Sequence, residues 1–146
     1  MKILYISNYP LSGTLSPSIN EIGFVTALND KFQQNIMCFI ADSASEINIP
    51  KERLRYFKTV PLSKIFSYFI HTFQWVLKAR KILSDFEPDI IIIRTRSAPL
   101  KEILLTLLTN KKIILKSSAK YWMDGKPLGI VDLYRRKLDL LLCRKL

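Results

Sequence analysis

Short apolar runs alternate along this chain with longer stretches in which apolar residues recur at helical spacing. The runs rich in strand-forming residues predict strands over residues 2 to 7, 35 to 41, 54 to 60, 90 to 93 and 113 to 116. The helical spacing predicts helices over residues 18 to 32, 63 to 86, 100 to 109 and 130 to 146. Strands alternating with helices in this order predict an α/β fold, a Rossmann-like three-layer domain with a mostly parallel sheet.

Turn-forming residues and a capping pattern bear on where the first helix begins. Residues 8 to 17 are rich in Pro, Ser, Thr and Gly, and they predict a loop that continues neither the strand nor the helix. Ser18 and Glu21 lie three positions apart and predict a capping box at the start of the helix.

The longest predicted helix, residues 63 to 86, has apolar residues that fit one face. A crossover helix buries one face on its sheet, and this would account for them, but a basic and aromatic helix can also rest on an anionic membrane surface. The residues of that face are Ile65, Phe66, Phe69, Ile70, Phe73, Val76, Leu77 and Leu83.

Length and composition indicate one packed domain. The chain has 146 residues, of which 49% are hydrophobic, so disordered and low-complexity classes are excluded. The net charge is +11, and residues 74 to 146 hold 16 basic and 7 acidic groups. This asymmetry indicates an anionic partner, which could be phospholipid headgroups, nucleic acid or a phosphorylated small molecule. Nucleic acid is disfavoured, because no recognised binding motif accompanies the charge.

Cysteine and histidine usage argues against a metal site. Cys38 and Cys143 have neither metal-ligand nor redox spacing, and His71 is the single histidine. A Ser-His-Asp catalytic device would have to recruit that histidine, so we expect neither a metal nor a triad. With no signal-peptide core and no apolar stretch of 18 residues, the expected location is the cytoplasm.

Candidate binding residues follow the predicted strands, because ligands of parallel sheets bind at the carboxyl ends of the strands. Ser12, Gly13 and Thr14 lie between the first strand and the first helix, a position suited to a phosphate, but a single Gly without the rest of a phosphate-binding motif favours an ordinary turn. Arg94 and Arg96, with Ser97 beside them, end the isoleucine-rich strand. The two guanidinium groups could clamp a phosphate or carboxylate, or they could pair with an Asp or Glu of the protein.

Hydroxyls and rings follow the last predicted strand. Ser118, Tyr121 and Trp122 could bind a sugar or a lipid, or they could belong to a surface loop with its rings packed inward.

Four segments resemble the N-terminal domain of GT-B glycosyltransferases, particularly glycosyltransferase family 4. Residues 1 to 10, MKILYISNYP, resemble the opening strand of that domain, and the Gly-containing loop follows them. Residues 87 to 94, EPDIIIIR, resemble its Pro-Asp strand, and residues 110 to 115, NKKIIL, the strand after that. Residues 133 to 138, LYRRKL, resemble the helix before the next strand of the family.

The resemblance implies that residues 1–146 form a single acceptor-side domain, incomplete at its end, with the C-terminal nucleotide-sugar domain absent from this chain. Joined with that domain, on another chain or elsewhere, it would be a hexosyltransferase moving sugar from a nucleotide-sugar donor to a polysaccharide or lipid-linked acceptor. Alone, it would bind the donor weakly and transfer nothing. Peripheral attachment to the inner face of the plasma membrane would fit a lipid-linked acceptor.

The resemblance also assigns roles to residues. Ser12, Gly13 and Thr14 would lie near the donor diphosphate, while the acceptor cleft would be lined by Arg94, Arg96, Ser97, Ser118, Tyr121 and Trp122. No cofactor or metal is implied. Many members carry a histidine after the fifth strand, where this chain has Ser117, Ser118 and Ala119, so the catalytic residues stay unassigned. The alternative function is a non-catalytic basic module that docks on an anionic membrane surface or a partner subunit.

Overall fold

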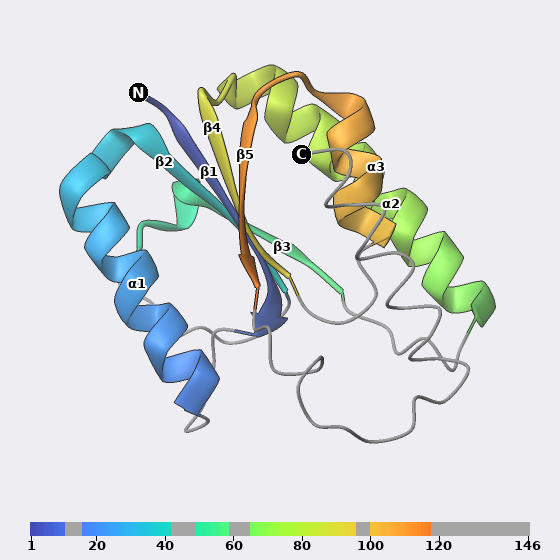
Figure 1. The fold of residues 1–146 in the computed structure, drawn as a ribbon, viewed down its shortest axis with the longest axis horizontal. Helices are drawn as coiled ribbons and strands as arrows, with labels where there is room; N and C mark the ends of the chain where they lie inside the picture. Colours follow the sequence, from blue (N-terminus) through green and yellow to red (C-terminus); the bar gives the residue numbers. More distant parts are fainter. Residues whose placement is uncertain (11–15, 42–48, 59–64, 96–99, 118–146) are drawn as a thin grey trace.

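The computed structural model describes residues 1–10, 16–41, 49–58, 65–95 and 100–117 (Figure 1). The strands are β1 (Ile3–Pro10), β2 (Ile36–Ala41), β3 (Leu54–Phe57), β4 (Ile90–Thr95) and β5 (Lys112–Ser117). The helices are α1 (Ser16–Phe32), α2 (Ile65–Phe86) and α3 (Leu100–Leu108), with short 3-10 turns η1 (Gln33–Asn35) and η2 (Lys51–Arg53). The predicted helix over residues 130 to 146 lies outside the described residues.

The described strands form one five-stranded sheet in the order β3-β2-β1-β4-β5, and every neighbouring pair is parallel. Helix α1 covers one face, and α2 and α3 cover the other (Figure 1). This arrangement confirms the predicted α/β, Rossmann-like three-layer fold.

The central strand, β1, fixes the place where a ligand would bind. Leu4 is in register with Met37 of β2 on one side and with Ile91 of β4 on the other. The chain moves outward from β1 to β3 and then returns to β4, so the connections after β1 and β4 leave in opposite directions. In open parallel sheets, this switch point opens a crevice at the carboxyl ends of the strands.

Two apolar cores lie on either side of the sheet, because successive strand residues point to opposite faces. On the α1 side, Tyr5, Val25 and Cys38 are buried, and Phe24 packs against them. On the other side, Trp75 of α2 stacks on Phe39 at a centroid distance of 5.6 Å, and Phe57 meets Phe39 edge-on at 4.7 Å.

The loop predicted over residues 8 to 17 is shorter than expected. Strand β1 continues to Pro10, which pairs with Ala41 after a shift in register beyond Ser7. Proline is tolerated at such an irregular strand end because no regular ladder bond from its nitrogen is needed. Helix α1 already begins at Ser16.

The predicted capping box is wrong. Because α1 begins at Ser16, Ser18 lies within the helix, and Glu21 is buried against the sheet with 2% of its surface exposed.

The apolar face predicted for α2 is not the face that packs on the sheet. The buried residues of α2 are Thr72, Trp75, Ala79 and Ile82. The exposed large apolar residues of the same helix are Phe66, Phe69, Ile70, Phe73 and Leu77. Burial on the sheet therefore does not account for most of the residues predicted to be buried. Within the described residues, no helix is both long enough and apolar enough to cross a membrane.

Candidate functional site

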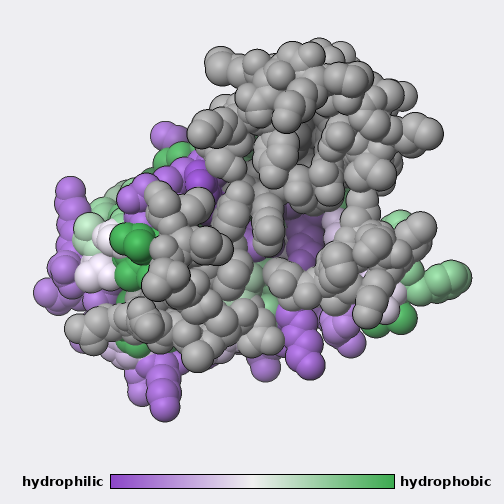
Figure 2. Space-filling view, turned by 90° about the horizontal axis from the view of Figure 1, so that it is seen from below, coloured by the Kyte–Doolittle hydropathy of each residue, from purple (hydrophilic) through white to green (hydrophobic). Residues whose placement is uncertain are grey.

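Charged side chains gather at the carboxyl ends of β1, β4 and β5, on both faces of the sheet. Figure 2 views the molecule from this side, and hydrophilic residues are visible between the grey ones. On the α1 face the cluster of polar and charged side chains comprises Tyr5, Glu21, Arg94 and Lys116, which we call the Glu21 cluster. On the opposite face it comprises Asn8, Lys101 and Glu102, which we call the Glu102 cluster.

Glu21 is the centre of the first cluster. Its Oε2 lies 3.3 Å from Nε of Arg94 at the end of β4, and its Oε1 lies 3.2 Å from Nζ of Lys116 at the end of β5. The hydroxyl of Tyr5 donates a hydrogen bond to the same Oε1. A buried carboxylate is strongly disfavoured unless it is paired and hydrogen-bonded, and these donors supply both needs.

Burial and the neighbouring carboxylate control the state of Tyr5. Its phenol is removed from water, and ionisation beside Glu21 would bring two negative charges together, so the pKa of Tyr5 is raised well above its ordinary value. Tyr5 therefore stays protonated and acts as a hydrogen-bond donor.

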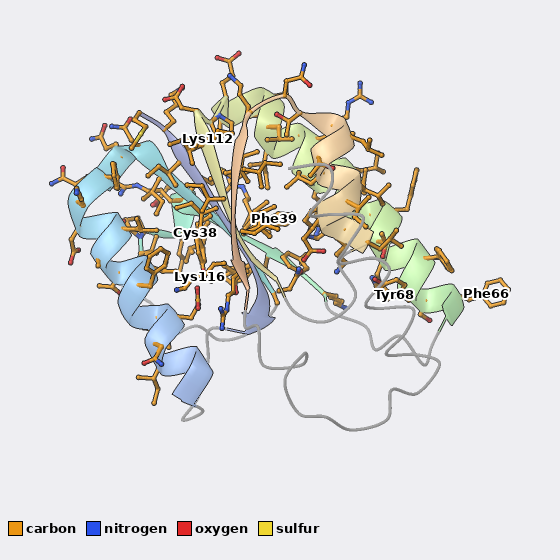
Figure 3. All side chains as sticks on the ribbon, in the orientation of Figure 1. Cys38, Phe39, Phe66, Tyr68, Lys112 and Lys116 are labelled. Carbon is orange, nitrogen blue, oxygen red and sulfur yellow. The ribbon has the colours of Figure 1, made fainter. Side chains whose placement is uncertain are left out.

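Lys116 is the more accessible cation of this cluster. Its side chain is 34% exposed, compared with 13% for Arg94. The Nζ atom lies 3.7 Å from the centroid of the Phe24 ring, a cation–π contact that orients the ammonium. In Figure 3, Lys116 lies nearer the carboxyl end of β5 and Lys112 near its start.

The Glu102 cluster joins β1 to the first turn of α3. The side-chain amide of Asn8 donates a hydrogen bond to Oε1 of Glu102, which is buried. Beside Glu102, Nζ of Lys101 lies 4.7 Å from the centroid of Phe57 and 6.0 Å from that of Trp75. Burial lowers the pKa of Lys101, and the negative charge of Glu102 partly opposes that shift.

Three buried polar atoms near this face have no hydrogen-bond partner among the described residues. They are Oδ1 of Asn8, Oγ1 of Thr72 and Nε1 of Trp75. Buried polar atoms usually find a partner in protein, water or ligand, so these atoms offer one acceptor, one hydroxyl and one donor.

The structure describes one of the residues predicted to bind ligand. Two alternatives were predicted for Arg94, a ligand clamp or a pair with an Asp or Glu of the protein. In the structure Arg94 pairs with Glu21, which is the second of these. The rest lie outside the described residues: Ser12, Gly13, Thr14, Arg96, Ser97, Ser118, Tyr121 and Trp122.

The sequence patterns did not identify Asn8, Glu21, Glu102 and Lys116 as site residues. Asn8 directly follows the strand predicted over residues 2 to 7, and Lys116 ends the apolar strand predicted over residues 113 to 116, so their positions carried a usable signal. Glu102 lies in the first turn of α3, directly after β4 and its connection. The spacing of Glu21 from Ser18 predicted a helix cap and not a binding site.

No group of His, Cys, Asp and Glu residues in the described ranges could hold a metal ion. Cys38 is fully buried, and burial raises the pKa of its thiol to about 12, so it stays protonated at neutral pH. The cations, carboxylates and amides of the Glu21 and Glu102 clusters are suited to holding a polar or anionic ligand at the strand ends.

Comparison of this chain with protein-family models, with curated proteins and with solved structures finds no match.

Proposed function

We propose that this chain is the acceptor-binding half of a GT-B-type glycosyltransferase, which transfers sugar from a nucleotide-sugar donor to a polysaccharide or lipid-linked acceptor. The proposal joins the resemblance of four sequence segments to a Rossmann-like sheet with charged groups at its switch point. Fold alone supports many functions, so the argument depends on the chemistry at the strand ends.

The observation that carries the proposal is the Glu21 cluster. Two cations, Arg94 and Lys116, face one carboxylate, so the cluster keeps a net positive charge at the carboxyl edge. A nucleoside diphosphate and a pyrophosphate-linked lipid are both anionic, and cations fixed at the edge of the sheet would attract either one. Lys116 is exposed enough to reach such a phosphate with the hydrogens that Glu21 does not accept.

The side chains of the Glu102 cluster are suited to a sugar or another hydroxyl-rich ligand on the face of the sheet opposite the Glu21 cluster. Carboxylate and amide groups are usual hydrogen-bond partners of sugar hydroxyls, and Glu102 and Asn8 supply one of each, while the hydroxyl of Thr72 is buried on the same side of the sheet. Oδ1 of Asn8 and Oγ1 of Thr72 have no partner among the described residues, so a ligand hydroxyl that reached them would gain hydrogen bonds at little cost.

Transfer itself forms a bond from an acceptor oxygen to the anomeric carbon of the sugar and breaks the bond from that carbon to the diphosphate oxygen, so the negative charge growing on the departing nucleoside diphosphate must be stabilised. In the enzymes that this chain resembles, a second domain holds most of the nucleotide-sugar. The 146-residue chain should therefore bind nucleotide-sugars weakly and transfer none. A measurable transfer rate from the purified chain would contradict the half-enzyme proposal.

Two lysines of β5 provide a matched binding test. Lys112 and Lys116 lie on the same face of one strand, at its opposite ends, so each substitution by Gln removes one charge from the same strand face. Titration of UDP-glucose, UDP-N-acetylglucosamine and GDP-mannose should show that Lys116→Gln weakens binding about threefold to tenfold. The Lys112→Gln variant should bind as the wild type does.

Two results would overturn the site. Equal weakening by both substitutions would mean that nucleotide-sugars sense only the overall charge of the chain. If the wild-type chain bound none of the three nucleotide-sugars, the proposed contact between Lys116 and the donor would be wrong.

A further inference from the structure

Five large apolar side chains form an exposed stripe along the outer side of α2. We call Phe66, Phe69, Ile70, Phe73 and Leu77 the α2 stripe. Phe66 is 87% exposed and Phe73 is 64% exposed. The residues are three or four apart, so they share one face over about 17 Å of helix. In Figure 3, Phe66 projects away from the sheet at the end of α2.

The α2 stripe is separate from the face on which the helix packs. With about 100° of rotation per residue, Trp75 and Ala79 each lie about 160° from Leu77 around the helix axis, and Thr72 lies about 100° from Phe73. Thr72, Trp75 and Ala79 are buried, and the last two belong to the core of that side of the sheet. The fold therefore already has its packing face, and the α2 stripe is an additional apolar surface that contributes nothing to this core. Contiguous exposed apolar surface of this kind marks an interaction site.

Positive charge adjoins the α2 stripe. Arg80 and Lys81 are exposed just beyond it, and α2 has no acidic residue before Asp85. Lys78 lies farther round the helix, where its Nζ donates to the carbonyl of Tyr56 at 3.4 Å. Arg80 and Lys81 lie about 60° and 40° to either side of Leu77 around the helix axis. An apolar face bordered by lysine and arginine is the pattern of a helix that lies in a membrane interface.

We propose that the α2 stripe rests on an anionic lipid surface. Its rings enter the boundary between headgroups and acyl chains, while Arg80 and Lys81 meet the lipid phosphates. The same charges disfavour other occupants. A second copy would bring the same cations into contact, and residues 118 to 146 have a net charge of the same sign, with 7 basic and 3 acidic groups. The inference does not depend on the proposed sugar chemistry.

Co-sedimentation of the full chain with vesicles tests this surface. Wild type should bind vesicles of phosphatidylcholine mixed with phosphatidylglycerol, and Phe66→Gln/Phe73→Gln should lower the partition coefficient at least about tenfold. Leu107→Gln is the matched control, because Leu107 of α3 is 64% exposed, as is Phe73, but lies outside the α2 stripe. The control should bind as the wild type does.

The charge contribution is measured separately. Arg80→Gln/Lys81→Gln should abolish the preference for phosphatidylglycerol over pure phosphatidylcholine, and salt should weaken binding of the wild type. Equal binding of wild type to both vesicle types would overturn the proposed role of these cations.

Other occupants of the α2 stripe give distinct results in the Phe66→Gln/Phe73→Gln variant. If vesicle binding is unchanged but sedimentation velocity shows that a dimer dissociates, the occupant is a second copy. If vesicle binding is unchanged but the melting temperature falls, the stripe packs against the chain itself. Either result overturns the lipid proposal.

Discussion

The Nζ atom of Lys116 lies 3.2 Å from Oε1 of Glu21, although 95 residues separate them in the chain. This contact joins the end of β5, at the edge of the sheet, to α1. Because Arg94 at the end of β4 meets the other oxygen of Glu21, one buried carboxylate holds the ends of two strands to one helix.

Substitution of Glu21 by Gln should destabilise the protein strongly. Gln fills nearly the same volume but removes the negative charge that pairs with Arg94 and Lys116, and breaking buried pairs in this way costs about 3 kcal/mol or more. The free energy of unfolding measured in urea should fall by that amount. Glu52→Gln, at an exposed position of η2, should change it by less than about 0.5 kcal/mol. Equal effects of the two substitutions would show that Glu21 does not hold the strand ends.

The protein should lose stability as pH rises above 9. Burial raises the pKa of Cys38 from an ordinary 9.0 to about 12, so the folded chain keeps a proton that the unfolded chain releases. The stabilising contribution is complete below pH 9 and declines by up to about 1.4 kcal/mol per pH unit as pH rises toward 12. Tyr5, whose pKa is also raised, adds to the loss above pH 10.

The Cys38→Ala variant isolates this effect. It should be less stable at neutral pH because it leaves a small cavity, but its stability should fall less steeply between pH 9 and pH 10. Urea unfolding in a reducing buffer measures both slopes. Parallel pH dependences for wild type and variant would mean that the Cys38 thiol is not the titrating group. Lys101 acts in the opposite direction, because its lowered pKa makes stability rise as pH approaches 10.5.

Glu87→Gly should stabilise the protein. Glu87 follows the last residue of α2 with φ of 49°, and its N–H donates to the carbonyl of Leu83 at 3.1 Å, which is the geometry of a left-handed helix cap. Glycine adopts this conformation without a side-chain clash, so a gain of about 0.5 kcal/mol in the free energy of unfolding is expected. Ser84→Gly, inside the last turn, should lower it by about 0.5 kcal/mol. The same sign for both substitutions would contradict the cap.

The order of strands and helices was predictable because it depends on local patterns. Four consecutive isoleucines at residues 90 to 93 predicted a strand, and β4 lies between β1 and β5 in the interior of the sheet. The end of β1 was not predictable, because Pro10 pairs with Ala41, which follows it by 31 residues. That pairing is a tertiary contact and leaves no local pattern.

The face of α2 that packs on the sheet was not predictable for a different reason. Apolar residues occupy both sides of this helix, and the side with more of them is the exposed one. Trp75 and Ala79 pack on the sheet because Phe39 and Phe57 face them there, and helical spacing alone carries no information about that partner. Arg94 was recognised as a candidate site residue, but its partner Glu21 is 73 residues away and was interpreted as a helix cap.

The proposed function is tested most directly by mapping ligand contacts on the labelled chain. Amide signals of the ¹⁵N-labelled protein are followed while UDP-glucose, UDP-N-acetylglucosamine or GDP-mannose is added. The account predicts that at least one of them shifts the signals of Asn8, Arg94 and Lys116 at the carboxyl edge, while Lys112 at the opposite edge is unaffected. Shifts confined to α2 or the amino ends of the strands, or no shifts with any of the three, would contradict it.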